Sequence, residues 1–216
     1  MTAMKVLDIH THVLPDQPGL ALVALDCNPD GIVAGHLFSA GIHPWTADEN
    51  TPGRLDLLYG MLHDPSIAAV GECGLDALKG PSLEIQTDVL IRQIGFSETF
   101  EKPLVLHVVR CFDQIIALKK RLKPAQRWLI HGFRGGWQQA QQLTALGFEL
   151  SLGLKSRPET MRFMPSERLF LETDGQCAIE RVVEMAAAVR NVSPDAVRLD
   201  ASRNASDFLG HSCFVS

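Results

Sequence analysis

The sequence predicts an α/β protein whose parallel strands close into a distorted (β/α)8-type barrel that lacks its first one or two crossover helices. Three observations lead to this expectation. The chain contains eight short apolar runs of strand length, helical patterns follow most of the later runs, and proline, glycine and aspartate occupy the first two connections. Strands that alternate with helices are typical of a parallel sheet, and eight such units can close into a barrel.

The first three strands are joined in an unusual way. The first connection carries Pro15, Pro18 and Gly19 and the second carries Pro29 and Gly31, so neither predicts a helix. Because a parallel crossover normally needs about a dozen residues or more, this part of the barrel either lacks its helices or is locally antiparallel. The wall near these strands is then bare, and we expect the C-terminal helix or another subunit to cover it. The eight expected strands lie near residues 5–10, 20–26, 35–41, 66–72, 103–107, 127–131, 147–152 and 168–173.

Helical patterns occupy the remaining connections and the C-terminal part of the chain. Ser82 is a plausible start for the second helix, Pro124 stops the third, and Gly147 is a good C-cap for the fourth. The expected helices span residues 55–63, 82–100, 112–122, 137–146, 179–189 and 196–209. The third helix ends in a basic cluster that we expect to face solvent and to complement the helix dipole: Lys119, Lys120, Arg121 and Lys123.

Composition limits the class of protein. The 216 residues are 46% hydrophobic, which is enough for one sizeable core, and we expect a single domain over residues 1–216. The formal net charge of -5 gives no support for a protein that grips long duplex nucleic acid with a basic stripe. Any contact with nucleic acid is therefore expected to be local to a cleft.

Cysteine usage and hydropathy predict a cytoplasmic protein. The five cysteines are scattered, odd in number and without a C-x-x-C pair, which fits reduced thiols better than a disulfide framework. No apolar stretch is long enough to span a membrane, and the N-terminus lacks the pattern of a signal peptide. We expect no membrane association and see no sign of an obligate protein partner.

Potential metal ligands stand at the C-terminal ends of the expected strands. His10 and His12 close the first strand, and because side chains alternate along a strand both imidazoles project from the same face. An isolated pair at this spacing is more often incidental than functional. Four further strands end at potential ligands, in the order Glu72, His107, His131 and Asp174. Since the strand C-termini of a parallel barrel meet at one face, these side chains predict a divalent-metal site there.

The ordered motifs resemble the TatD-type metal-dependent deoxyribonucleases. The resemblance rests on the segments Asp8–His12, Gly41–Pro44, Gly71–Asp76, Leu106–Arg110 and Leu171–Asp174, together with residues 130–133, and it covers nearly the whole chain. It implies a distorted TIM barrel with a two-metal centre that hydrolyses phosphodiester bonds, often from a DNA 3′ end. The Gly71–Asp76 stretch and the downstream Glu-Thr-Asp are its most specific parts.

The resemblance also implies roles for the ligands. His10, His12 and Asp174 would hold one divalent ion, His107 and His131 would hold a second, and Glu72 would bridge the two. The ions would be zinc, manganese or magnesium, because imidazoles favour zinc and carboxylates allow the other two. Glu72 and Asp174 would be the catalytic residues, and Asp174 is the best candidate to orient the attacking water or accept its proton.

Three further residues are candidate substrate contacts. Arg110 stands in the family-like position after His107, and its planar guanidinium suits a phosphate group. His43 lies in a family motif, where a cleft-edge contact and a structural role are both open, and Arg134 replaces a residue that is usually small in the family. Asp8 is expected to point inward below His10, either as an orienting partner of that imidazole or as a structural contact. The expected substrate is a DNA end or a small phosphodiester.

Three other functions stay open at this point. An amidohydrolase-like enzyme would cleave a C–N or lactone bond with the same metals, but such enzymes often bridge them with a carboxylated lysine, and no lysine ends an expected strand. A phosphoesterase of the polymerase-and-histidinol-phosphatase (PHP) type shares the N-terminal motif but fits the segment Gly71–Asp76 less well. A descendant that only binds is disfavoured, because buried charged ligands without a metal cost several kcal/mol.

Overall fold

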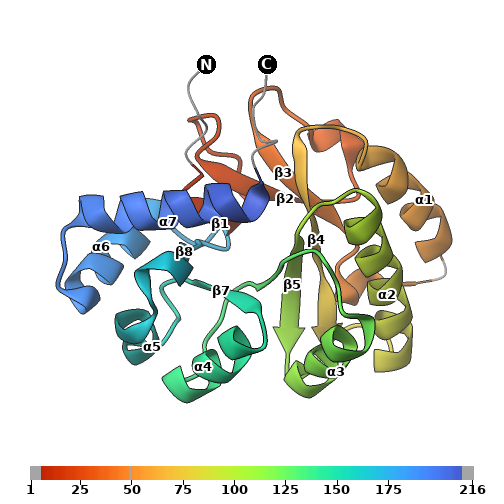
Figure 1. The fold of residues 1–216 in the computed structure, drawn as a ribbon. Helices are drawn as coiled ribbons and strands as arrows, with labels where there is room; N and C mark the ends of the chain where they lie inside the picture. Colours follow the sequence, from red (N-terminus) through yellow and green to blue (C-terminus); the bar gives the residue numbers. More distant parts are fainter. Residues whose placement is uncertain (1–5, 49, 211–216) are drawn as a thin grey trace.

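The computed structural model describes residues 6–48 and 50–210, in which eight parallel strands form a closed barrel in chain order (Figure 1). Each strand pairs in parallel with its neighbours, and Asp8 of the first strand pairs with Leu171 of the last, which closes the ring. The strands are β1 (Asp8–Thr11), β2 (Ala21–Asp26), β3 (Leu37–Gly41), β4 (Ile67–Asp76), β5 (Leu104–Val109), β6 (Trp128–Ile130), β7 (Phe148–Leu152) and β8 (Phe170–Leu171). The predicted barrel and all eight strands are confirmed, although residue 5 of the first expected strand and Cys213 lie outside the described residues.

Helices cover the outside of the barrel from β3 onward (Figure 1). All six expected helices are present, with α1 beginning four residues earlier than expected because Asn50 and Pro52 start it. The short helix between β7 and β8 was not predicted. The helices are α1 (Thr51–Met61), α2 (Leu83–Thr99), α3 (Phe112–Leu122), α4 (Trp137–Ala145), α5 (Pro158–Phe163), α6 (Ile179–Arg190) and α7 (Pro194–Leu209). None of the described helices is both long and apolar enough to cross a membrane.

The first two crossovers contain no α-helix, as the sequence predicts. The β1–β2 connection is irregular, and the β2–β3 connection holds only the 3-10 turn η1 (Pro29–Gly31), which Asn28 caps through its side chain. Both strand pairs are nevertheless parallel. Of the two alternatives, the barrel therefore lacks its first two helices, and it is not locally antiparallel.

Other elements fill the wall that the missing helices would cover. The outward side chains Val23 and Phe38 share one buried hydrophobic cluster with Leu58 of α1 and with Cys27 of the β2–β3 connection. The Cys27 thiol lies 3.3 Å from the Gly41 carbonyl oxygen at the end of β3, which ties this connection to the barrel. Residues of α1 and of the β2–β3 connection, rather than the expected C-terminal helix, thus pack with the outward side chains of this wall.

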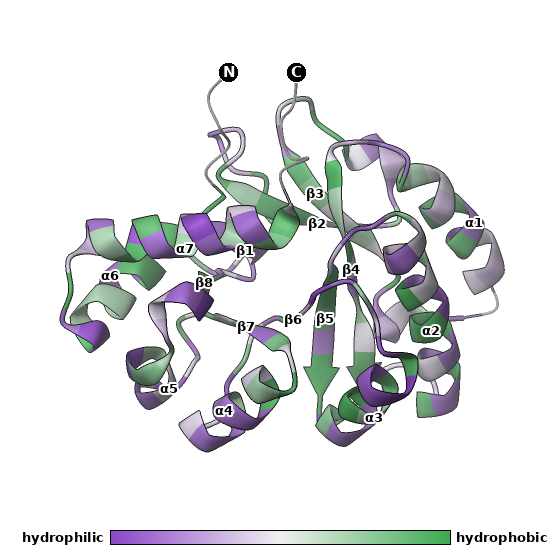
Figure 2. Ribbon diagram, viewed as in Figure 1, coloured by the Kyte–Doolittle hydropathy of each residue, from purple (hydrophilic) through white to green (hydrophobic). Residues whose placement is uncertain are grey.

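The C-terminal helix α7 closes the end of the barrel opposite to the strand C-termini. Val105 and Leu129 lie two residues before His107 and His131, so they point the same way into the barrel, and they share a buried cluster with Phe208 of α7. The Phe208 ring packs edge-on against Phe170 of β8, with ring centres 5.7 Å apart. In Figure 2 the inner strands are largely hydrophobic, whereas α7 alternates hydrophobic and hydrophilic residues.

Lys119 departs from the expectation that the basic end of α3 faces solvent. Its ammonium group donates to the Gly147 carbonyl oxygen at 2.8 Å and lies 4.6 Å from the centre of the Phe148 ring. Burial lowers the pKa of Lys119 from 10.5 to about 8. The apolar stem of this residue is therefore part of the packing between α3 and β7.

The lowered pKa of Lys119 predicts a pH-dependent contribution to stability. Between about pH 8 and about pH 10.5 the unfolded chain binds more protons at this group than the folded chain, so its contribution to the unfolding free energy rises with pH. We expect the gap in unfolding free energy between Lys119→Met and the wild type to move in favour of the wild type across this window, as measured by urea titration. A gap that stays constant with pH would show that the Lys119 pKa is not lowered.

Candidate metal centre

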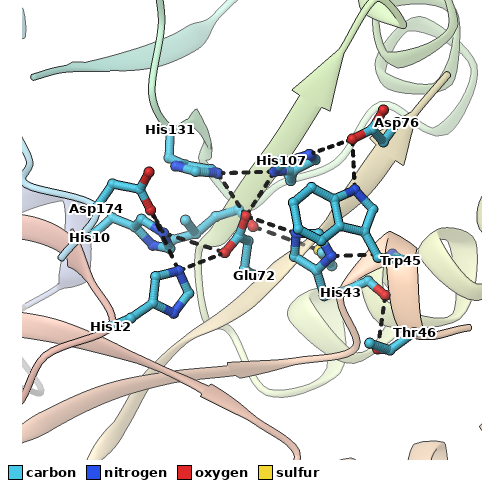
Figure 3. Close-up of polar contacts among 12 residues, drawn as sticks. His10, His12, His43, Trp45, Thr46, Glu72, Asp76, His107, His131 and Asp174 are labelled. Carbon is cyan, nitrogen blue, oxygen red and sulfur yellow. Dashed lines mark hydrogen bonds and ion pairs between the residues drawn. The ribbon is translucent and has the colours of Figure 1, made fainter. Parts of the chain in front are cut away.

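The strand C-termini bring Glu72 to the middle of a cluster of imidazoles (Figure 3). One carboxylate oxygen, Oε1, lies 2.8 Å from His131 Nε2 and 2.9 Å from His107 Nδ1. The same oxygen lies 3.1 Å from His43 Nε2. Three imidazoles from β5, β6 and the end of β3 thus converge on one carboxylate oxygen.

The other Glu72 oxygen faces the histidine pair of β1. Oε2 lies 3.4 Å from His10 Nε2 and 3.4 Å from His12 Nε2. Asp174 completes this side, with its Oδ1 3.5 Å from His12 Nε2 and 3.9 Å from His10 Nε2. All six residues predicted as metal ligands therefore lie together in one cluster.

Glycines in β4 allow Glu72 to reach this position. Gly71 has φ +145° and Gly74 has φ +146°, conformations that L side chains rarely adopt. A Cβ atom at Gly71 would lie 2.4 Å from the Val105 carbonyl oxygen, and one at Gly74 would lie 2.0 Å from that of His107. The Gly-Glu-Cys-Gly motif is thus a requirement for the close approach of β4 and β5. Cys73 packs away from the cluster with its thiol toward the Val105 carbonyl.

At the candidate ligands, burial and neighbouring charges shift the pKa values in opposite directions. Burial alone would raise the pKa of Glu72, but the positive charge of His131 and the close imidazoles of His10, His107 and His12 hold it below its ordinary value. Burial would lower the pKa of His131, but the Glu72 and Glu172 carboxylates raise it to about 10. His10 is wholly buried, and this burial lowers its pKa. The cluster therefore combines imidazole nitrogens with ionised carboxylates in a small buried volume.

This donor set fits a divalent metal ion. His10 Nε2, which faces Glu72 and Asp174, is buried without a hydrogen-bond partner, which is costly for a polar atom unless something else satisfies it. Three triads in the described chain have donor atoms close enough together to hold one ion: His10, His12 and Glu72; His43, Glu72 and His107; and His10, His131 and Asp174. Glu72 belongs to the first two of these triads. Imidazole with carboxylate is a set that suits zinc and manganese.

Carboxylates also lie behind two of the imidazoles, and sequence reasoning assigned them no role. Asp76 Oδ2 lies 3.1 Å from His107 Nε2, on the ring edge away from Glu72. Glu172 Oε2 lies 3.6 Å from His131 Nδ1 and accepts a hydrogen bond from Ser151 at 2.7 Å. Both carboxylates belong to the quoted Gly-Leu-Asp and Glu-Thr-Asp motifs, so the motifs contained a signal for them.

Asp8 joins the first and last strands. Its carboxylate accepts hydrogen bonds from the Thr173 backbone N–H at 3.0 Å and the Thr173 hydroxyl at 2.6 Å. It also accepts from the His10 backbone N–H at 3.3 Å, but it has no hydrogen bond to the His10 ring. Of the two roles considered for Asp8, the structure therefore shows the structural one. The Asp174 backbone N–H donates to the His10 carbonyl oxygen at 3.1 Å and holds the same two strand ends together.

The candidate substrate contacts lie in different places. His43 lies in the cluster beside Glu72, with a side chain only 16% exposed. Arg134 is exposed and lines a small cavity that also includes Asp174. Arg110 is exposed just after β5 with φ +55°, and it lines neither that cavity nor the main cleft. The main cleft has a volume of about 410 Å³, and its lining includes Trp45, Asp26 and all the predicted ligands except the buried His10.

Sequence and structure comparisons point to one family. The model of the TatD related DNase family matches residues 33–210. The chain is 28% identical over 172 residues to the 3′-5′ ssDNA/RNA exonuclease TatD of Klebsiella pneumoniae (strain 342), a match that covers 74% of this chain and 65% of that protein. It is 30% identical over 150 residues to the uncharacterized metal-dependent hydrolase YjjV of Escherichia coli (strain K12), covering 64% and 58%. The matches thus span less than two thirds of the length of these relatives.

Solved structures show the same fold. The crystal structure of YJJV, a TatD homolog from Escherichia coli K12, superposes with a TM-score of 0.79 at 22% identity and covers 93% of this chain and 96% of that one. A TatD family hydrolase from Entamoeba histolytica superposes with a TM-score of 0.76 at 13% identity, covering 96% and 99%. At these identities the likeness bears on the fold alone.

Proposed function

Because this chain belongs to the family of TatD-related DNases, we propose that it is a metal-dependent hydrolase that cleaves phosphodiester bonds at nucleic-acid ends or in small phosphodiesters. The observation that carries the proposal is the position of Glu72, with one oxygen facing His10 and His12 and the other facing His107 and His131. A buried carboxylate between two groups of imidazoles is an arrangement suited to bridge two cations. Relatives named as 3′-5′ ssDNA/RNA exonucleases support the phosphodiester substrate.

We propose that the centre holds two divalent ions, of zinc, manganese or magnesium. His10, His12 and Asp174 would hold one, His107 and His131 the other, and Glu72 both. His43 is a candidate ligand beside Glu72 and His107 in addition to a candidate substrate contact. Bound ions of this kind would lower the pKa of water toward neutrality and polarise a phosphoryl oxygen.

Side chains of the protein would accept the proton of the attacking water and bind the substrate. Asp174 is 30% exposed toward the cleft, so its carboxylate is available to orient the attacking water and to accept its proton. Its Oδ2 accepts a hydrogen bond from the Gln176 side chain at 2.7 Å, which limits its rotation. We assign Arg134 to a phosphate group of the substrate, because it lines the small cavity beside Asp174, and Arg110 to a phosphate that lies outside the main cleft.

The size of the cleft favours a chain end over a long duplex. A volume of about 410 Å³ lies in the range typical of small-molecule sites, which is about 300–1,000 Å³. The net charge of -5 gives no support for a protein that binds a duplex through an extended basic surface. We propose that a strand end or a free nucleotide diester enters this cleft, in a single-domain cytoplasmic protein that needs no obligate protein partner.

Two other chemistries have less support. An amidohydrolase-like centre with a carboxylated lysine does not fit, because Glu72 takes the bridging place and no described residue that lines the main cleft is a lysine. A PHP-type phosphoesterase shares the histidine pair, but the family model that matches is that of the TatD related DNases. The phosphodiesterase is therefore the function that we put to the test.

The decisive experiment is metal-dependent turnover. Apo protein would be titrated with Zn²⁺, Mn²⁺ and Mg²⁺ against bis-nitrophenyl phosphate, a labelled single-stranded DNA, and a panel of small amides and lactones. We expect metal-dependent cleavage of the phosphodiesters, and for DNA shortening from the 3′ end. Metal binding with activity on amides or lactones alone would retain the centre and refute the proposed substrate class.

A further inference from the structure

The carboxylate of Asp76 is held in one orientation at the end of β4. Its Oδ1 accepts hydrogen bonds from the backbone N–H groups of Leu78 at 2.7 Å and Lys79 at 3.2 Å. Its Oδ2 is turned toward Trp45, whose indole N–H donates to it at 2.6 Å, and toward His107 (Figure 3). With both oxygens engaged, the carboxylate cannot turn away without breaking several hydrogen bonds.

The backbone around Asp76 is fixed by a second buried side chain. Gln86 of α2 is only 1% exposed, and its amide oxygen accepts from the Asp76 backbone N–H at 2.8 Å. Its amide nitrogen donates to the carbonyl oxygens of Asp76, Lys79 and Pro81. These hydrogen bonds hold the loop after β4 against α2, and they fix the position of Asp76 beside His107.

We propose that Asp76 is a positioning residue that fixes the tautomer of His107, with the proton on Nε2 and the lone pair of Nδ1 turned toward the metal centre. An ionised carboxylate only accepts hydrogen bonds, so the Asp76 oxygen 3.1 Å from Nε2 demands a proton on that nitrogen. In a neutral imidazole the other nitrogen then carries the lone pair. That nitrogen is Nδ1, which lies 2.9 Å from Glu72 Oε1.

This tautomer of His107 suits metal binding through Nδ1, and it does not suit a hydrogen bond from Nδ1 to Glu72. A lone pair on Nδ1 would face the lone pairs of Glu72 Oε1, which is repulsive unless a cation lies between the two atoms. His131 Nε2 is also within 3.4 Å of His107 Nδ1, so three potential donor atoms share one small space. An outer carboxylate that selects the tautomer of a metal-binding histidine also raises the basicity of the ligand. The inference rests on the metal centre proposed above, but not on the identity of its substrate.

Trp45 extends this contact to the wall of the cleft. Its indole N–H and His107 Nε2 share the same Asp76 oxygen, and the two rings meet edge-on with centres 5.4 Å apart. The Trp45 side chain is also 44% exposed at the cleft. Its hydrogen bond to Asp76 therefore joins an exposed aromatic ring to the carboxylate that contacts His107. His131 has a weaker version of the arrangement, because Glu172 is 3.6 Å from its Nδ1. Asp76 is therefore the sharper case to test.

The test is the protonation pattern of His107 in full-length protein labelled with ¹⁵N-histidine. The His107 signals are identified by their absence from a His107→Gln sample, in the metal-free and the Zn²⁺-loaded protein. We expect a protonated Nε2 and an unprotonated Nδ1 in the wild type when the imidazole is neutral, and Zn²⁺ on Nδ1 after loading. A wild-type His107 that carries its proton on Nδ1, or binds Zn²⁺ through Nε2, overturns the proposal without need of any variant.

Variants then measure the effect on metal binding by calorimetry with Zn²⁺ alone. Asp76→Ala is expected to mix the tautomers and to weaken Zn²⁺ binding by about 10- to 100-fold, the usual effect of losing an outer partner. Asp76→Asn, whose amide oxygen can still accept from Nε2, is expected to recover part of the loss. A folded Asp76→Ala with the wild-type tautomer and an affinity within about twofold of the wild type overturns the proposal.

A control variant separates positioning from loop structure. Asp64 is another carboxylate that accepts bonds from its own loop, at the Ser66 N–H and hydroxyl, but it has no histidine contact in the described structure. We expect Asp64→Ala to leave Zn²⁺ affinity and the His107 signals unchanged. Because none of these measurements needs a substrate, a failed phosphodiesterase assay would leave this result standing, and the reverse also holds.

Discussion

Replacement of Glu72 by alanine will remove metal-dependent turnover and weaken the binding of both divalent ions. Among the described residues, Glu72 is the one carboxylate that faces all five clustered imidazoles, through contacts of 2.8–3.4 Å to His10, His12, His43, His107 and His131. Loss of an outer partner of a metal ligand typically costs up to about 100-fold in activity or affinity, so loss of the bridging residue should cost more than about 100-fold. The measurements are bis-nitrophenyl phosphate turnover and Zn²⁺ calorimetry on protein whose fold is checked by circular dichroism.

A matched pair of variants makes this result specific. Glu72→Gln keeps the shape of the side chain but removes its charge, and it should lose nearly as much as the alanine variant if charge is what holds the cations. Glu84→Ala removes an exposed carboxylate at the start of α2 and should leave turnover unchanged. A folded Glu72→Ala protein that turned over phosphodiester at the wild-type rate would refute the proposed centre.

Phe208→Ala will destabilise the protein without altering its metal centre. The Phe208 ring is only 3% exposed, packs against Phe170, and lies 5.3 Å from the Arg127 guanidinium. Truncation of a buried phenylalanine costs about 3–5 kcal/mol, because the lost contacts leave a cavity that the surroundings fill only in part. Here the cavity would open at the end of the barrel that α7 closes, so urea unfolding should show a large loss of unfolding free energy.

The distance between Phe208 and the ligands separates stability from activity. Well below its unfolding temperature, the Phe208→Ala protein should bind Zn²⁺ as tightly as the wild type. Leu199→Ala on the same helix is a control, because that side chain is 68% exposed and its loss should change stability by less than about 0.5 kcal/mol. A loss below about 1 kcal/mol for Phe208→Ala would mean that α7 contributes little to the barrel.

Much of the barrel and of the candidate centre could be predicted because each ligand ends an apolar run. A buried strand needs a continuous hydrophobic stretch, and a polar residue directly after it marks the end that meets the other strand ends. This rule brought Glu72, His107, His131 and Asp174 together from separate parts of the chain, and in the structure all four line one cleft. The prolines and glycines of the first connections likewise predicted the two missing helices.

The features that sequence reasoning missed depend on packing or on short segments. Helix α5 has six residues, too few to show a helical period. The contact of Asp76 with Trp45 and His107 joins positions 31 residues apart, and no local pattern encodes it. His43 follows β3 after Ile42, so the rule that found the other ligands applied to it as well, although its motif left a cleft-edge contact and a structural role open.

The seam between β1 and β8 determines when the centre can form as the chain is made. Asp8 and Thr173 are 165 residues apart, and their hydrogen bonds, with that of Asp174 to His10, join the first and last strands. Contacts of such long sequence separation carry a high loop-closure cost and form late. On a ribosome, His10 and His12 are synthesised first but must wait for Asp174 before their half of the centre is complete. Metal loading should therefore follow barrel closure, and a nascent chain that stops before β8 should hold its first ion only weakly.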